Sequence, residues 1–336
     1  MSTLSPSSEA AQLGPLLPTH HYPTDTSFHL SYRFHLINSA SNFVETLVTD
    51  RLLDEARLRI VRHEFAPEFQ PNRKLSFGAR LNIDSISFAS DSAGTVKRTV
   101  LGDQSIFAEF RVLDEPGSSL GFAGVIKIPG YSNPTLLEFQ DSGAARVILP
   151  GDAQTDASFL ITTEYWAGSN LRFRGDAGYT VRLDGYAAEL PYNVAVGIVN
   201  PKMDFELRVR GNLSAGKGEA NDADTQTLRD AFGNSDYAYS PNPWVMVIEP
   251  AVELWISAKS AITFQYSYSL MGNRSPSFHS MAAGYTYRWA ETRSRPRKTF
   301  SEVPIYTDQE AGKFEGDATT PQSESLYMEE DPVFEN

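Results

Sequence analysis

The chain has 336 residues, of which 41% are hydrophobic and 12% aromatic, and it contains no cysteine. The net charge of −13 argues against an extended nucleic-acid footprint, and the absence of thiols excludes cysteine nucleophiles and thiolate metal sites. No run of about 18 apolar residues occurs, which excludes a transmembrane helix but not the alternating strands of a membrane β-barrel.

Residues 1–25 are rich in Ser, Pro, Thr and His, and we expect them to form an irregular, flexible arm. The first residues lack the basic and apolar segments of a signal peptide. An outer-membrane protein needs such a signal for export, so we expect the sequence to be that of the mature chain.

Between the arm and the tail, the dominant pattern is the two-residue period of β-strands. The clearest segment is 170–183, where Leu171, Phe173, Tyr179, Val181 and Leu183 take one face and Asn170, Arg172, Arg174, Asp176, Thr180 and Arg182 take the other. A strand of this length exceeds the five or six residues typical of soluble sheets and suits a tilted strand that spans a bilayer.

The alternating pattern marks thirteen candidate strands. Bacterial barrels have an even number of strands, so one of these assignments must be wrong and we expect twelve or fourteen. One alternative is that segment 41–58 is helical, and another is that 136–149 supplies a further pair of short strands. The expected strands are 27–37, 42–50, 56–65, 74–84, 105–113, 118–128, 158–167, 170–183, 192–199, 204–214, 244–257, 260–270 and 278–289.

The connections between these strands alternate in length along most of the chain. Short ones are expected at 114–117, 168–169, 200–203 and 258–260, and long ones at 85–104, 129–157, 184–191, 215–243 and 271–277. Outer-membrane barrels place short turns in the periplasm and longer loops outside, whereas a sandwich with crossovers has no reason to keep this order. The alternation therefore favours an all-β fold: a closed antiparallel transmembrane β-barrel of 12–14 strands over residues 26–291.

In such a barrel the apolar face of each strand meets lipid and the polar face lines a wet interior. The side chains predicted to line the lumen are Arg172, Arg174, Asp176, Arg182, Asp204, Glu206, Arg208 and Arg210. They could set ionic selectivity or hold a plug by ion pairs, or they could form a network that only stabilises the barrel. A soluble sandwich, in which the apolar faces meet each other, is the alternative that periodicity alone does not separate.

Several aromatic residues lie near the expected strand ends, where amphipathic rings favour the headgroup level of a membrane. The predicted membrane-interface aromatics are Trp166, Tyr179, Trp255, Tyr285, Tyr287 and Trp289. The competing explanation is that β-strands favour aromatic residues in any environment.

Residues 292–336 are expected to form an acidic periplasmic tail. Within it, residues 301–336 carry ten acidic residues and one base, Lys313. Such a composition predicts disorder in isolation, and its short apolar clusters either dock onto a periplasmic partner protein or remain passive.

No residue set converges on a catalytic reaction, and no motif for a metal or cofactor is found. His29 and His35 share one face of the first strand but lie too far apart for one metal ion. The acids Asp152, Asp156 and Glu164 are interpreted as solvated loop residues rather than a Ca²⁺ site. We therefore expect no enzyme, no metal and no cofactor.

Three short segments resemble MetA-type and related FadL-like outer-membrane transporters over about residues 75–290. Residues 118–130 (SSLGFAGVIKIPG) resemble the strand that ends in Lys-Leu-Pro-Thr-Gly in that family, and residues 151–159 (GDAQTDASF) resemble its Gly-rich Gln-x-Asp segment. Residues 178–182 (GYTVR) resemble its GYRxR strand. The resemblance implies a monomeric outer-membrane barrel that imports small hydrophobic compounds.

The sequence thus predicts a protein of the bacterial outer membrane, in contact with its lipid and not with nucleic acid. The expected function is a pore or transporter for passive uptake of small molecules. One alternative is a structural barrel whose termini anchor an envelope or periplasmic assembly, and another is a soluble β-rich binding domain.

Overall fold

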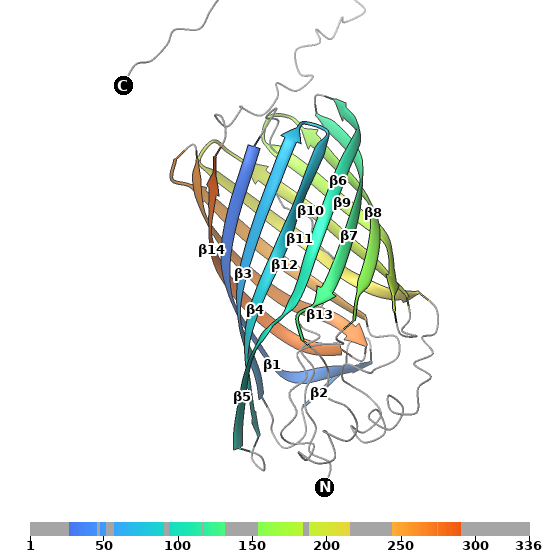
Figure 1. The fold of residues 1–336 in the computed structure, drawn as a ribbon, viewed down its shortest axis with the longest axis vertical. Coiled ribbons are helices and arrows are strands. Elements are labelled where there is room, and N and C mark those ends of the chain that lie inside the picture. Colours follow the sequence, from blue (N-terminus) through green and yellow to red (C-terminus); the bar gives the residue numbers. More distant parts are fainter. Residues whose placement is uncertain are drawn as a thin grey trace, which may run out of the picture. The chain divides into compact units, whose positions relative to one another are not determined.

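A computed structural model describes residues 27–45, 48–51, 57–90, 94–115, 117–131, 154–183, 188–215, 244–257, 259–273 and 275–289. These residues form an all-β structure in which twelve strands close into one antiparallel barrel (Figure 1). Among the described residues, no helix has the length and apolar character needed to cross a membrane. The predicted arm and tail lie outside the described residues, so these two domain boundaries stay predictions.

The barrel strands follow one another around the wall mostly in chain order, and the barrel closes where the last strand pairs with the first. They are β1 (Ser27–Glu45), β3 (Arg57–Asn72), β4 (Leu75–Ser90), β6 (Asp103–Glu115), β7 (Ser118–Pro129), β8 (Asp156–Ala167), β9 (Leu171–Arg182), β10 (Ala188–Val199), β11 (Met203–Ala215), β12 (Trp244–Trp255), β13 (Ser260–Asn273) and β14 (Ser275–Arg288). Two further strands, β2 (Val48–Arg51) and β5 (Gly94–Leu101), pair with β1 and β4.

Twelve barrel strands confirm the even number expected from the sequence. The predicted long connection at 271–277 is wrong, because β13 runs to Asn273 and β14 already begins at Ser275. The prediction of a separate barrel strand at 42–50 is wrong, because β1 continues past an irregularity between Ser39 and Ser41 and β2 only folds back on it. The helical alternative for 41–58 is also wrong for its described residues, which are strands. The alternative pair at 136–149 lies outside the described residues.

The predicted long loop at 85–104 is wrong as well. There β4 continues to Ser90 and pairs with β5, which occupies the middle of the supposed loop. The β5 sequence, GTVKRTVL, is rich in the β-branched residues that favour strands, although its Lys-Arg pair interrupts the apolar alternation.

The short turns predicted between β6 and β7, β8 and β9, β10 and β11, and β12 and β13 are confirmed, and they lie at one end of the barrel. Gly117 and Gly168 stand in two of them with φ of 91° and 75°, a backbone region that glycine occupies without steric cost. At the opposite end, much longer connections join Pro129 to Asp156 and Ala215 to Trp244. The barrel therefore has a short-turn end and a loop end.

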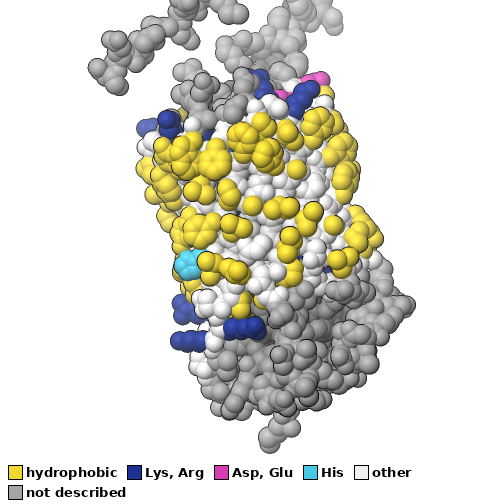
Figure 2. Space-filling model, in the orientation of Figure 1, with side chains coloured by type: hydrophobic (Ala, Val, Ile, Leu, Met, Phe, Trp, Pro, Cys, Tyr) yellow, Lys and Arg dark blue, Asp and Glu magenta, His cyan; other side chains and the backbone are white. Residues whose placement is uncertain are grey.

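The side chains on the two faces of the wall are inverted relative to a soluble protein. On β9, Phe173, Tyr179 and Val181 are 41–50% exposed, whereas the alternating Arg172 and Arg182 are at most 8% exposed. Figure 2 shows a broad band of hydrophobic side chains on the outer surface of the face in view. A soluble sandwich would bury these apolar side chains against each other, so that alternative is wrong.

A tyrosine–histidine pair lies within the apolar outer face. The Tyr32 hydroxyl lies 2.8 Å from Nδ1 of His63. The rings of Phe34 and Phe65 flank the pair at centroid distances of 5.5 and 5.1 Å, and both are exposed on the outside. In lipid, where water cannot satisfy the imidazole, this hydrogen bond lets a histidine face the membrane.

Removing the hydroxyl tests this explanation. We expect Tyr32→Phe to lower the free energy of unfolding by about 1–2 kcal/mol, because His63 then lacks its partner. Urea titrations in lipid vesicles measure the loss, and Tyr268→Phe is the matched control because Tyr268 is also outward-facing and 45% exposed. An equal loss in both variants would mean that the hydrogen bond has no special role.

Candidate functional site

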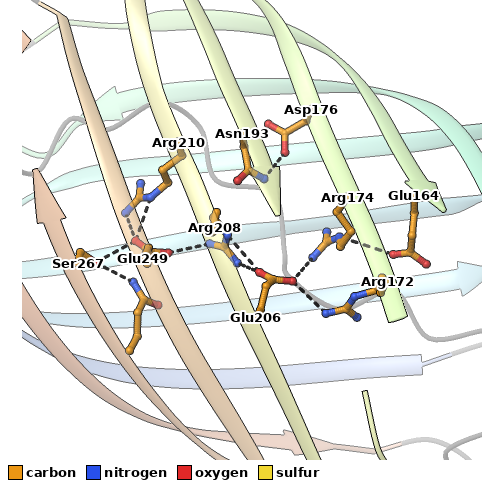
Figure 3. Close-up of polar contacts among 11 residues, drawn as sticks. Glu164, Arg172, Arg174, Asp176, Asn193, Glu206, Arg208, Arg210, Glu249 and Ser267 are labelled. Carbon is orange, nitrogen blue, oxygen red and sulfur yellow. Dashed lines mark hydrogen bonds and ion pairs between the residues drawn. The ribbon is translucent and has the colours of Figure 1, made fainter. Parts of the chain in front are cut away.

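A cluster of charged side chains lies on the inner face of strands β8, β9, β11 and β12 (Figure 3). Its members occupy alternate positions along each strand, and the two-residue period of the backbone points them all toward the interior. We call it the charged cluster, and it consists of Glu164, Arg172, Arg174, Glu206, Arg208, Arg210 and Glu249.

Glu249 on β12 receives more hydrogen bonds than any other member described here. Its carboxylate accepts from Arg208 Nη1 at 2.9 Å and from Arg210 Nε and Nη2 at 3.0 and 2.8 Å. The Ser267 hydroxyl on β13 donates at 2.9 Å. Glu249 is 1% exposed, so the charge is both closed to water and compensated by two guanidinium groups.

Glu206 continues the cluster along the wall toward β9 and β8. It accepts from Arg172 Nη2 at 3.0 Å and from Arg208, and Arg174 Nη1 lies 3.9 Å away. Arg174 also approaches Glu164 on β8, with 3.6 Å between Nε and Oε2. Basic and acidic groups therefore alternate along the inner face from β8 to β12, with cluster members on β8, β9, β11 and β12.

Three other predicted lumen residues lie on the inner face but apart from these ion pairs. Asp176 accepts a hydrogen bond from Asn193 at 2.7 Å, and Asp204 is buried nearer the short-turn end of β11. Arg182 lies nearer the loop end, where it bonds Glu189 at 2.8 Å and approaches Asp156 at 3.7 Å. The structure thus places all eight predicted residues on one face and brings five of them together.

No lumen position was predicted for Glu249 or Glu189, and Glu164 was predicted to be a solvated loop acid. Residues 244–255 read WVMVIEPAVELW, with apolar residues on both faces. The alternation in this strand therefore does not indicate that Glu249 faces inward. Glu189 stood inside a segment predicted as a loop, whereas β10 begins at Ala188.

A second group of charges lies on the facing wall. Arg62 on β3 binds Asp84 on β4 through two hydrogen bonds of 2.7 Å, and Arg33 on β1 lies 3.7 Å from Glu64. Arg80 on β4 lies within electrostatic range of Glu64 and Arg33, and also of Arg208 and Arg210. Because β4 and β11 stand opposite each other in the strand order, charges from both walls act on the same part of the lumen.

The inner face also carries two apolar patches. One comprises Phe107, Ala123, Val125 and Leu160 on β6, β7 and β8. The other lies near the loop end and comprises Ile37, Leu58, Ile60, Ile86, Val245, Val247 and Phe278. The interior is therefore divided into charged and apolar regions, which a uniformly polar inner face would not predict.

The predicted interface aromatics divide between the two faces. Tyr179, Tyr285 and Trp289 are 43–54% exposed on the outside, and the Tyr287 ring lies 4.7 Å from that of Trp289. The prediction is wrong for Trp166 and Trp255, which lie on the inner face. Each of the two occupies a position of its strand whose side chain points inward. Trp166 Nε1 donates a hydrogen bond to Glu164 at 2.7 Å, and the Arg288 guanidinium lies 5.0 Å from the centre of the Trp255 ring.

Comparison with known proteins gives a likeness of fold. No family model and no curated protein matches the chain. A solved outer-membrane channel from Pseudomonas putida F1 superimposes with a TM-score of 0.56 at 11% identity, covering 82% of this chain and 100% of that one. That likeness shows the fold of an outer-membrane β-barrel.

Two other solved barrels are more distant. The β domain of the Bordetella autotransporter BrkA has a TM-score of 0.45 at 11% identity, covering 78% of this chain and 99% of its own. The KdgM porin, solved with oligogalacturonate, has 0.44 at 3% identity, covering 77% and 98%. Scores this low carry no argument about what the present chain does.

Proposed function

We propose that the chain is a pore of the bacterial outer membrane that passes small molecules down their gradient, and that it is not an enzyme. The observation that carries this proposal is the inversion of the barrel wall, with exposed Phe, Tyr and Val outside and ion-paired Arg and Glu inside. Such a wall suits lipid on one side and ions or solutes on the other. The fold of the Pseudomonas putida channel supports the same reading.

The charged cluster is the part of the interior that would discriminate between solutes. Arg208 and Glu249 are 4% and 1% exposed, so a solute that passes them displaces or replaces their partners. Compact polar or charged solutes can exchange hydrogen bonds with these two side chains, whereas a hydrophobic molecule would leave the side chains without partners. We therefore favour polar solutes at this position.

The resemblance to MetA-type and FadL-like transporters favours hydrophobic compounds instead. The apolar patches on the inner face are the feature that would contact such compounds. A solute with an apolar body and a charged group would use both regions of the lumen. This finer assignment is a proposal that rests on the resemblance and on the patches.

Planar bilayer recordings test the pore. The purified chain, shown to be a folded barrel by heat-modifiable mobility on a denaturing gel, should give discrete conductance steps. A sample unfolded by boiling is the control and should give none. A folded, membrane-inserted barrel without conductance would contradict the pore and leave the anchoring alternative, in which residues 292–336 bind a periplasmic partner.

The anchoring alternative draws its support from the ten acidic residues and single base of residues 301–336. A tail of this charge favours a basic partner surface. Residues 292–336 lie outside the described part of the chain, so the anchoring role is a proposal.

A further inference from the structure

Strands β3, β4 and β5 continue as a sheet beyond the level at which β6 leaves β4. Pairing between β4 and β6 ends at Arg80, and pairing between β4 and β5 begins at Ile83 (Figure 1). The register aligns Arg59, Ser87 and Lys97 in one row across the three strands. This extension belongs to the loop end of the barrel.

The outward face of the extension changes from apolar to basic along the strands. Ile83 and Leu101 pair with each other and are 39% and 56% exposed, as expected for lipid contact. Nearer the loop end, the outward positions are occupied by Arg59 on β3 and Lys97 on β5. Arg57 occupies the next outward position of β3, and all three side chains are exposed. We call these three residues the basic patch, and Figure 2 shows Lys and Arg side chains beyond that edge of the apolar band.

Among the residues that the structure describes, the basic patch has hydrogen-bonding neighbours on its own face but no acidic ones. Ser85 and Thr99 lie in the adjacent outward row, with their hydroxyl oxygens 3.1 Å apart. The outward positions of the described segments 57–65, 81–89 and 95–101 hold no Asp or Glu, since Glu64 and Asp84 point inward. None of the ion pairs formed between described residues includes a member of the patch.

We propose that the basic patch binds the phosphate groups of a phosphorylated glycolipid in the outer leaflet. The inference rests on the proposed function only in that the barrel spans the outer membrane with its long loops outside. Basic side chains just beyond a lipid-facing band lie at headgroup level, where Arg and Lys pair with phosphate oxygens and nearby hydroxyls can donate as well. One side of the barrel would then carry a bound lipid.

The test uses the folded full-length chain in detergent, with diphosphorylated lipid A as the probe and bound lipid measured by native mass spectrometry. The variant R57Q/R59Q/K97Q removes the patch, and K74Q/K202Q/K259Q removes the same charge from exposed short-turn residues at the other end. Each basic residue near an anionic surface contributes about fivefold to binding, so we expect at least a tenfold loss in the first variant only.

Each other outcome overturns the proposal. Wild-type binding by R57Q/R59Q/K97Q would show that the patch is not used, and an equal loss in the control would show unspecific attraction. Equal binding of dephosphorylated lipid A would assign the affinity to acyl chains. Displacement by equimolar inorganic phosphate would indicate a site for free anions.

Conductance recorded from the same samples separates this inference from the pore. Both variants should conduct as the wild type does, because neither changes the lumen. A wild-type barrel that binds lipid A through the patch but does not conduct would contradict only the pore.

Discussion

Replacing Glu249 with Gln should lower the free energy of unfolding by about 3–5 kcal/mol, the usual cost of removing one partner from a buried ion pair. The carboxylate takes hydrogen bonds from Arg208, Arg210 and Ser267 and is 1% exposed. An amide of the same shape offers one oxygen and no charge, so two guanidinium groups remain buried without full compensation. Urea titration in vesicles, followed by tryptophan fluorescence, measures the change.

Glu115→Gln provides the control for this prediction. Glu115 is exposed at the short-turn end of β6, and its neutralisation should change the unfolding free energy by less than about 0.5 kcal/mol. If Glu249→Gln were as stable as this control, water or ions would have to solvate the arginines in the lumen. The charged cluster would then be an open lining rather than a packed network.

The alternation in segments such as 170–183 was enough to predict the barrel wall. A strand has a period of two whatever it packs against, and each strand of a membrane barrel keeps one face toward lipid and the other toward the interior. The same alternation placed Arg172 and Arg208 on one inner face. Their partners could not be predicted in the same way, because pairing depends on which strands become neighbours and in what register.

The failures have specific causes. The phase of Glu249 was hidden by apolar residues on both faces of β12, since the interior there holds the apolar Val245 and Val247. Trp166 and Trp255 were assigned to the membrane interface because they lie close to strand ends. The face on which a side chain lies depends instead on whether its position along the strand is odd or even. Trp166 lies an even number of residues from the inward-facing Glu164, and Trp255 an even number from Glu249. The β4–β5 pairing was missed because Lys97 and Arg98 do not match the apolar alternation of a lipid-facing strand.

The largest functional effect is expected from Arg80→Gln, which should make the pore less permeable to anions relative to cations. Among the described residues, no ion pair includes Arg80, yet its charge acts on the same space as those of Arg33, Arg208 and Arg210. Neutralising it removes one positive charge from the lumen without breaking a hydrogen-bonded pair, so stability and selectivity can be separated.

A unit charge next to a passing ion contributes about 1 kcal/mol at water-like screening, so losing it should lower the anion permeability roughly fivefold and raise the cation permeability roughly fivefold, which lowers their ratio roughly 25-fold. Reversal potentials across a salt gradient measure this ratio, and Lys74→Gln, in the turn between β3 and β4, gives the same charge change outside the lumen. An unchanged ratio for Arg80→Gln, or an equal shift for Lys74→Gln, would remove the inner charges from the selectivity mechanism. A shift confined to Arg80→Gln would place the ion path between β4 and β11, where the two charged walls face each other.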